Sequence, residues 1–330
     1  MSKIFLLAVN LAWLGMVTAG AAGTNDNNDG QLFQFKFDAN KPLIYGVDIK
    51  VRQVTDSDIG QRTSLTRTTT DTRYKMRLTA AGTNRDGTVV VYYEPFDYEQ
   101  DSQTTAPSGQ IDMTTRGLKI ISKHNGIAMI DTEKGIGFSQ AQTAKQAVYP
   151  HLLTGYMDFE PSGNIKSYEG DLAFIDTWQT MLKDMTNLFY IAFPTNALAV
   201  NDSWTNYYGF KTIGPIAFSG DGITQAWDYV RGPDQATTNG PIASFTVYMS
   251  SNYKDLDAYL DQFGQQTAMN IPQYTESINS TYQFDQKRGY LVSETQSENL
   301  HQDMSMMVQG NAGTSHGDTE RNVSIVLLSP

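Results

Sequence analysis

The chain has 330 residues, of which 40% are hydrophobic and 18% are charged, and its formal net charge is -11. This length suffices for one large domain or two modest ones. An acidic balance argues against nucleic acid as the main partner. Because the chain contains no cysteine, a disulfide framework, thiolate catalysis, a cysteine-ligated metal and a lipid anchor on cysteine are all excluded.

Residues 1–21 predict a secretory signal peptide. Lys3 precedes an apolar run that ends at Val17, and small residues follow at positions 19–21. The run is shorter than the roughly 20 residues needed to span a bilayer. We therefore expect export to the periplasm or the extracellular space, with no transmembrane segment left after cleavage; an uncleaved anchor is the alternative. Residues 22–30 are predicted to form a flexible polar leader.

Alternating apolar and polar residues predict strands in the first half of the remaining chain. In segment 31–38 the alternation places Phe33, Phe35 and Phe37 on one face. Turn residues at 84–87 and 124–126 predict hairpins, and residues 99–109 predict a polar loop. The strands predicted by this pattern are 31–38, 45–52, 62–80, 88–97, 111–122, 127–131, 156–160 and 165–169.

Residues 171–193 predict the one long helix of the chain. Apolar residues recur there at steps of three and four, from Phe174 and Trp178 to Ala192, and polar residues fill the other side. Asp171 is a suitable cap, and Pro194 disfavours helix at the residue before it. Such an amphipathic helix must pack against a sheet, because its stability comes mainly from burying its apolar stripe.

The strand pattern resumes after the helix. Predicted strands are 203–213, 223–231, 242–253, 275–285, 290–308 and 319–328. A short helix is expected at 255–263, because Leu256, Tyr259, Leu260 and Phe263 have helical spacing. The fold class is therefore mainly β, with long curved antiparallel strands packed on a central helix. We expect residues 31–330 to form either one domain or two pseudo-repeats, 31–169 and 195–330, joined by the helix. We expect the strands to form either two pseudo-repeated sheets or one open half-barrel.

Three stretches carry a resemblance to a known group of proteins. They are FEPSGNIKSYEG at 159–170, FPTNALAVNDSW at 193–204 and TYQFDQKRGYLVSETQS at 281–297. The region from Phe33 to Leu328 resembles an exported bacterial family of mostly-β domains of unknown function, distantly similar to the helix-plugged half-barrels of periplasmic lipoprotein carriers. The resemblance implies a secreted, mostly-β fold, and it supplies no catalytic residues.

Catalytic and metal-binding patterns are weak in this sequence. The four histidines lack the spacing of paired metal ligands, so no metal site and no cofactor are expected. Residues 314–318, TSHGD, contain the residue types of a hydrolase but are interpreted as a polar loop. A basic strip formed by Arg62, Arg67, Arg73, Lys75 and Arg77 either binds an anion or is the solvated face of a strand.

Aromatic residues supply the candidate ligand-binding site. They could line a cavity for a lipid or sugar or simply pack in the core. The candidates are Trp178, Trp204, Tyr207, Tyr208, Phe210, Trp227 and Tyr229. We expect a protein that is not an enzyme and that binds an apolar or amphipathic ligand, such as a lipid, in the cell envelope. The alternative is a structural module with a solid core that binds an envelope protein.

Overall fold

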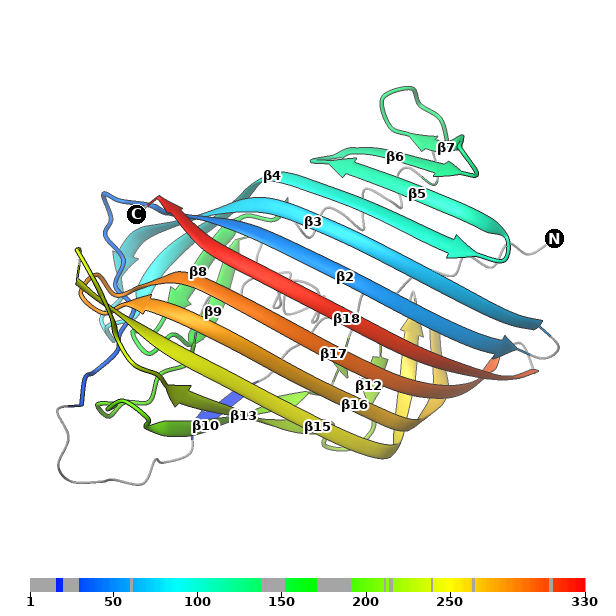
Figure 1. The fold of residues 1–330 in the computed structure, drawn as a ribbon. Helices are drawn as coiled ribbons and strands as arrows, with labels where there is room; N and C mark the ends of the chain where they lie inside the picture. Colours follow the sequence, from blue (N-terminus) through cyan, green and yellow to red (C-terminus); the bar gives the residue numbers. More distant parts are fainter. Residues whose placement is uncertain are drawn as a thin grey trace.

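The computed structural model of the chain describes residues 16–19, 30–59, 62–137, 140, 152–170, 191–210, 212–213, 216–238, 240–262, 265–308 and 311–329. These residues form a mainly β protein built around one large, open, antiparallel sheet (Figure 1). The mostly-β prediction is thereby confirmed. The predicted signal peptide and polar leader lie almost entirely outside the described residues, and both stay predictions.

The centre of the sheet consists of seven long strands that lie side by side as a curved wall (Figure 1). In spatial order they are β15 (Gly240–Gln262), β16 (Gln265–Asp285), β17 (Tyr290–Val308), β18 (Asn311–Ser329), β2 (Leu43–Ile59), β3 (Arg62–Thr83) and β4 (Val89–Ala106). Tight turns join β3 to β4 and β16 to β17, and Gly87 and Gly289 have φ values of 88° and 75° there. Glycine adopts such angles without the strain that a side chain brings.

Shorter strands attach to both ends of this wall. β4 pairs with β5 (Gly109–Arg116) along one part of its length and with β8 (Gly155–Phe159) along another. β15 likewise pairs with β12 (Ile216–Phe218), β13 (Ile223–Arg231) and β14 (Gln235–Thr237). The remaining strands are β1 (Met16–Ala19), β6 (Lys119–His124), β7 (Ile127–Asp131), β9 (Ile165–Gly170), β10 (Ser203–Phe210) and β11 (Thr212–Ile213).

The last strand, β18, joins the two halves of the sequence. It pairs with β17 on one side and with β2 on the other, and Ile325 stands between Glu294 and Val47. The strands from 43–106 and those from 240–329 are therefore parts of one sheet. Whether the two halves are repeats of one plan stays a prediction.

Three local predictions were wrong because strand pairing overrides short-range signals. Residues 111–122, predicted as one strand, fold back at Gly117 into β5 and β6, which pair with each other. Residues 99–106, expected in a loop, continue β4 and pair with β5. Residues 255–262, expected to be helical, belong to β15, where Leu256 and Ala258 face Ile271 and Met269 of β16. Helical spacing over so few residues competes poorly with a continuous ladder of inter-strand hydrogen bonds.

The predicted central helix lies mostly outside the described residues, because the description stops at 170 and resumes at 191. Its last three residues, 191–193, are described and have no regular secondary structure, so the prediction was wrong for them. The Phe193 amide donates to the Ser162 carbonyl at 2.8 Å, and its ring stacks on Phe33 with centroids 5.4 Å apart. This buried segment is therefore held by the β8–β9 turn and by aromatic contacts.

Segment 31–38 has the predicted faces but is not a strand. Phe33 and Phe35 are buried, whereas Gln34 and Lys36 are exposed. Its backbone bonds to loops, since the Phe35 amide donates to Pro161 O and the Lys36 amide donates to Gly289 O, both at 2.7 Å. The segment crosses the end of the sheet and inserts its phenylalanines into the core.

Candidate functional site

The long strands have two chemically different faces. On β3, Tyr74, Met76 and Leu78 are buried while Arg73 and Lys75 between them are exposed, as strand alternation requires. We call the buried side the inner face and the charged side the outer face. The inner face is described first, because it carries the predicted aromatic residues.

One end of the inner face is a dense aromatic core. Phe33 meets Phe245 edge to face at 5.0 Å, and Phe193 meets Phe284 at 5.1 Å. Such edge-to-face pairs are the favoured arrangement of aromatic rings in protein interiors. Side chains fill this end of the inner face, so its aromatic residues serve to pack the core.

A second apolar cluster occupies the other end of β15, β16 and β17. Its residues belong to the long strands and to the short β12 and β13 that pair with β15. The buried members of this second cluster are Ile216, Phe218, Ile223, Met249, Ala258, Met269, Ile271, Tyr274, Ile278 and Leu300. Trp227 packs against both clusters and therefore marks their junction.

The same face carries a belt of buried polar side chains. On β17 this belt separates the two clusters, and on β16 it reaches into the second cluster, where Glu276 stands between Tyr274 and Ile278. Glu276, Glu294 and Glu298 are no more than 2% exposed. Buried carboxylates are costly unless they are paired or hydrogen-bonded. We call these three residues, together with Gln225, Ser280, Gln296 and Arg321, the polar belt.

Two of the three carboxylates have clear partners. Glu298 Oε2 accepts a hydrogen bond from Arg321 Nη1 at 3.2 Å, and the two residues face each other across β17 and β18. Glu276 Oε2 accepts hydrogen bonds from Tyr274 Oη at 2.7 Å and from Gln225 Nε2 at 3.1 Å. The belt is therefore largely a satisfied network, as buried polar groups require.

Glu294 is different. It is 1% exposed, and no donor reaches hydrogen-bonding distance and geometry at either carboxylate oxygen. Burial raises the pKa of Glu294 to about 8, and the opposing influences of the Tyr282 hydroxyl and the Arg321 charge only partly offset that effect. Near neutral pH this carboxyl group is therefore mostly protonated.

The structure brings four of the predicted aromatic residues together on the inner face. Trp204 stacks on Tyr229 with centroids 5.0 Å apart, and Tyr208 packs on Trp227 at 5.3 Å. The hydroxyl oxygens of Tyr208 and Tyr229 lie 3.0 Å apart. β10 and β13 supply these residues in adjacent register.

The other predicted residues do not join this group. Tyr207 is 47% exposed, and its side chain lies on the opposite face from Trp204 and Tyr208, so the structure does not bring it together with them. Phe210 ends β10, and its side chain is not among those described. Trp178 lies outside the described residues.

Three tyrosine hydroxyls, those of Tyr208, Tyr229 and Tyr282, connect β10 and β13 electrostatically with Glu294. Tyr282 stands directly opposite Glu294 on β16. Burial raises the pKa values of Tyr229 and Tyr282. Tyr208 and Tyr282 raise the pKa of Tyr229 further, and Glu294 and then Tyr208 raise that of Tyr282 further. Tyr208, Tyr229, Tyr282 and Glu294 therefore form one electrostatically coupled group, which we call the tyrosine–glutamate cluster.

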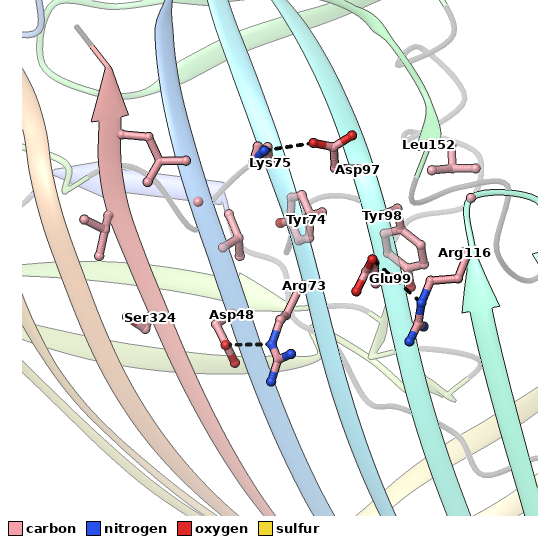
Figure 2. A pocket seen from close by; sticks show the side chains of 15 residues that line it. Asp48, Arg73, Tyr74, Lys75, Asp97, Tyr98, Glu99, Arg116, Leu152 and Ser324 are labelled. Atoms are coloured by element: carbon pink, nitrogen blue, oxygen red, sulfur yellow. Dashed lines mark hydrogen bonds and ion pairs between the residues drawn. The ribbon is translucent and has the colours of Figure 1, made fainter.

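Three of the five cations of the basic strip form ion pairs on the outer face. Arg73 pairs with Asp48 at 3.2 Å, Lys75 with Asp97 at 2.9 Å, and Arg77 with Glu94 at 2.7 Å. Figure 2 shows the first two pairs beside an open depression of about 770 Å³. For these three cations the pairing favours the solvated strand face over an anion site.

Two histidines contact aspartates on the outer face. His301 Nδ1 lies 2.8 Å from Asp318 Oδ1, and His316 Nδ1 lies 2.7 Å from Asp303 Oδ1. The TSHGD segment is therefore part of β18, and the expected polar loop was wrong. No group of three or more acidic or histidine ligands suited to a metal ion occurs among the described residues.

The polar belt was missed because its residues lie on different strands. A signal was nevertheless present, since Glu294, Glu298 and Leu300 share one face of a predicted strand by their even spacing. Glu276 likewise alternates in phase with Tyr274 and Ile278. Charged residues in phase with buried ones are the pattern that would have located it.

Comparison with known proteins yields only distant structural similarity. No protein family and no curated protein matches the sequence. The structure "Lipid-protein interactions in lipovitellin" aligns with a TM-score of 0.42 and 13% identity over 88% of this chain and 25% of that chain. OccK7 (OpdD) of Pseudomonas aeruginosa aligns with a TM-score of 0.21 and 7% identity over 88% of this chain and 99% of that chain.

A third structure, OpdK of Pseudomonas aeruginosa with vanillate, has a TM-score of 0.12 and 7% identity over 87% of this chain and 99% of that chain. The chain thus spans a quarter of the length of the lipovitellin chain it matches. At these TM-scores the similarity carries no argument about function.

Among the described residues, no helix has the length and apolarity needed to cross a membrane.

Proposed function

We propose that this protein is an exported, noncatalytic carrier or receptor that binds an amphipathic small molecule against the inner face of its sheet. One observation carries the proposal: a single face of continuous strands combines two apolar clusters with the polar belt, which separates them along β17 and reaches into the second cluster on β16. An amphipathic molecule offers the same combination of chemistry. Its apolar part matches the clusters and its polar part matches the belt.

Burying the charged residues of the polar belt costs free energy of folding, and this cost supports a binding role. Replacing a buried ion pair by packed apolar residues is often neutral or stabilising, so stability alone does not explain Glu298 and Arg321. Glu294 adds a buried carboxyl group whose oxygens have no donor of normal hydrogen-bond geometry. Buried polar groups that lack partners occur at functional sites, where a ligand, ion or water supplies what is missing.

A second candidate function is a structural or protein-binding module of the envelope. Trp204 favours it, because this residue is stacked on Tyr229 and its Nε1 donates to Ala192 O at 3.0 Å. A tryptophan held in this way belongs to a solid core. In this alternative the partners contact the outer face, and the polar belt serves only to specify strand register.

The test compares native and denaturing mass spectrometry of mature protein purified from the envelope fraction of its own host, combined with organic extraction. A noncovalent adduct of lipid-like mass that appears in the extract supports ligand binding. A clean unliganded mass, together with no saturable binding of any single-chain amphiphile, would contradict it. That result would favour the protein-binding module, whose partners would then be sought by crosslinking through the outer face.

A further inference from the structure

We propose that the tyrosine–glutamate cluster is the subsite for the head group of the ligand, and that this head group is an organic cation such as a quaternary or protonated ammonium. The inference rests on the proposed function, because it assigns a charge to the polar end of the amphipathic molecule. Tyr208, Tyr229, Tyr282 and Glu294 form the subsite, and Trp227 lies at its edge.

The first argument is that Glu294 lacks what an ammonium group supplies. Neither of its oxygens has a donor of normal hydrogen-bond geometry, and the Tyr282 hydroxyl opposite offsets its burial only in part, whereas Glu276 and Glu298 already have well-placed donors. A cation placed beside Glu294 would offset the desolvation of its ionised form. Among the buried carboxylates of the belt, Glu294 is therefore the one suited to a positively charged ligand.

The second argument concerns the aromatic residues. Tyrosine and tryptophan rings attract cations through their π faces, and quaternary ammonium groups are commonly bound by clusters of such rings together with a carboxylate. Tyr208 and Trp227 are only partly buried, in contrast to Tyr229 and Tyr282. They therefore form the accessible side of the cluster, and Glu294 forms its deep side.

The charges around Glu294 allow a cation to bind there. Tyr282 faces it from β16, uncharged Ile325 faces it from β18, and β15 contributes uncharged Phe245 beside Tyr282. Among the described residues, Arg321 is the cation that acts on Glu294, and its charge is offset by Glu298 at 3.2 Å. Arg321 faces a residue four positions along β17 from Glu294, which is roughly 13 Å of strand.

The raised pKa of Glu294 makes the inference measurable. Near neutral pH the free carboxyl group holds a proton, and binding a cation would release that proton to solvent and leave a carboxylate–cation pair. A quaternary ammonium has no titratable proton of its own. Any proton release or pH dependence of its binding therefore reports the protein.

The experiment measures calorimetric binding of three probes with the same decyl chain: decyltrimethylammonium, decyl maltoside and decyl sulfate, each below its micellar concentration. At pH 9, wild-type protein should bind decyltrimethylammonium more tightly than decyl maltoside or decyl sulfate. At pH 7 it should bind decyltrimethylammonium roughly tenfold more weakly than at pH 9, and each binding event should release close to one proton. Glu294→Gln should remove the pH dependence and the proton release while leaving decyl maltoside binding unchanged.

Two further variants complete the design. Glu320→Gln removes a carboxylate from an exposed position of β18 and should leave all three binding constants unchanged. Tyr208→Phe should weaken decyltrimethylammonium binding less than Glu294→Gln does, because it keeps the ring. If decyl maltoside or decyl sulfate binds as tightly as decyltrimethylammonium at pH 9, or if Glu294→Gln keeps the pH dependence, the head-group inference is wrong. If none of the probes binds, the proposed function fails as well.

Discussion

Arg321 and Glu298 form an ion pair inside the sheet, directly opposite each other on β18 and β17, with an Nη1 to Oε2 distance of 3.2 Å. The side chain of Glu298 is 2% exposed and that of Arg321 is 13% exposed, so neither charge is well hydrated. The two residues therefore depend on each other. Removing one of them is a more severe change than removing both.

Arg321→Met should lower the free energy of unfolding by about 3 to 5 kcal/mol, because it leaves the Glu298 carboxylate buried without its cation. The double change Glu298→Leu with Arg321→Met should recover much of the loss. Urea unfolding followed by circular dichroism measures both. Arg52→Met, on an exposed position of β2, is the control and should change stability by less than about 0.5 kcal/mol. Equal effects of the two arginine substitutions would contradict the role of the pair.

The stability of the protein should fall with rising pH because of Glu294. Its pKa in the folded state, about 8, exceeds the unfolded value near 4.3, so the folded state retains a proton that the unfolded state loses. The stabilising effect of protonation is complete below pH ~4.3 and is lost as pH rises through 8. Between pH ~4.3 and pH 7, the free energy of unfolding of Glu294→Gln should therefore fall by roughly 3 kcal/mol less than that of wild type. Parallel stability–pH curves for wild type and variant, from urea unfolding between pH 5 and 9, would disprove this.

Trp204 and Tyr207 test the division between the two faces of β10. Trp204→Ala removes a buried side chain that stacks on Tyr229, and should cost about 3 to 5 kcal/mol. Tyr207→Ala changes a side chain that is 47% exposed and should cost less than about 1 kcal/mol. Thermal unfolding of the two variants gives the comparison, and similar losses would mean that the assignment of faces is incorrect.

Arg231 should hold the segment around Phe33 against the sheet. It is buried, donates to Leu198 O, to Gln31 Oε1 at 3.3 Å and to Asp234, and its guanidinium lies 5.0 Å from the Phe33 ring. Arg231→Lys keeps the charge but loses the planar fork that reaches these acceptors. Hydrogen exchange in residues 31–37 should therefore accelerate in Arg231→Lys, while exchange in β17 stays slow. Equal protection of residues 31–37 in wild type and variant would show that other contacts hold the segment.

The long strands could be predicted because their side chains alternate. Residues 290–308 were predicted as a strand and form β17 with those bounds, and the turn at 84–87 joins two strands as expected. Sequence alone misplaced residues 99–106 and 255–262 because their pairing partners lie elsewhere in the chain. Local composition does not reveal which distant segment offers a strand edge.

The candidate site could be predicted only in its aromatic half. Trp204, Tyr208, Trp227 and Tyr229 were chosen correctly as neighbours, because β10 and β13 form a local pair. Glu294 and Tyr282 are joined to them only through the register of β13, β15, β16 and β17. Sequence order does not specify that register across several strands, and so the carboxylate half of the site could not be located.

The pairing of β18 with β2 has a consequence for how the chain folds. β2 is synthesised early and β18 follows the other described strands, so the pairing at the centre of the sheet cannot form until β18 has been made. Contacts between such distant segments form slowly, because a long loop must close first. Until then β2 and β17 expose strand edges that can pair with other chains. Deleting β18 should therefore yield aggregated protein rather than a smaller folded domain.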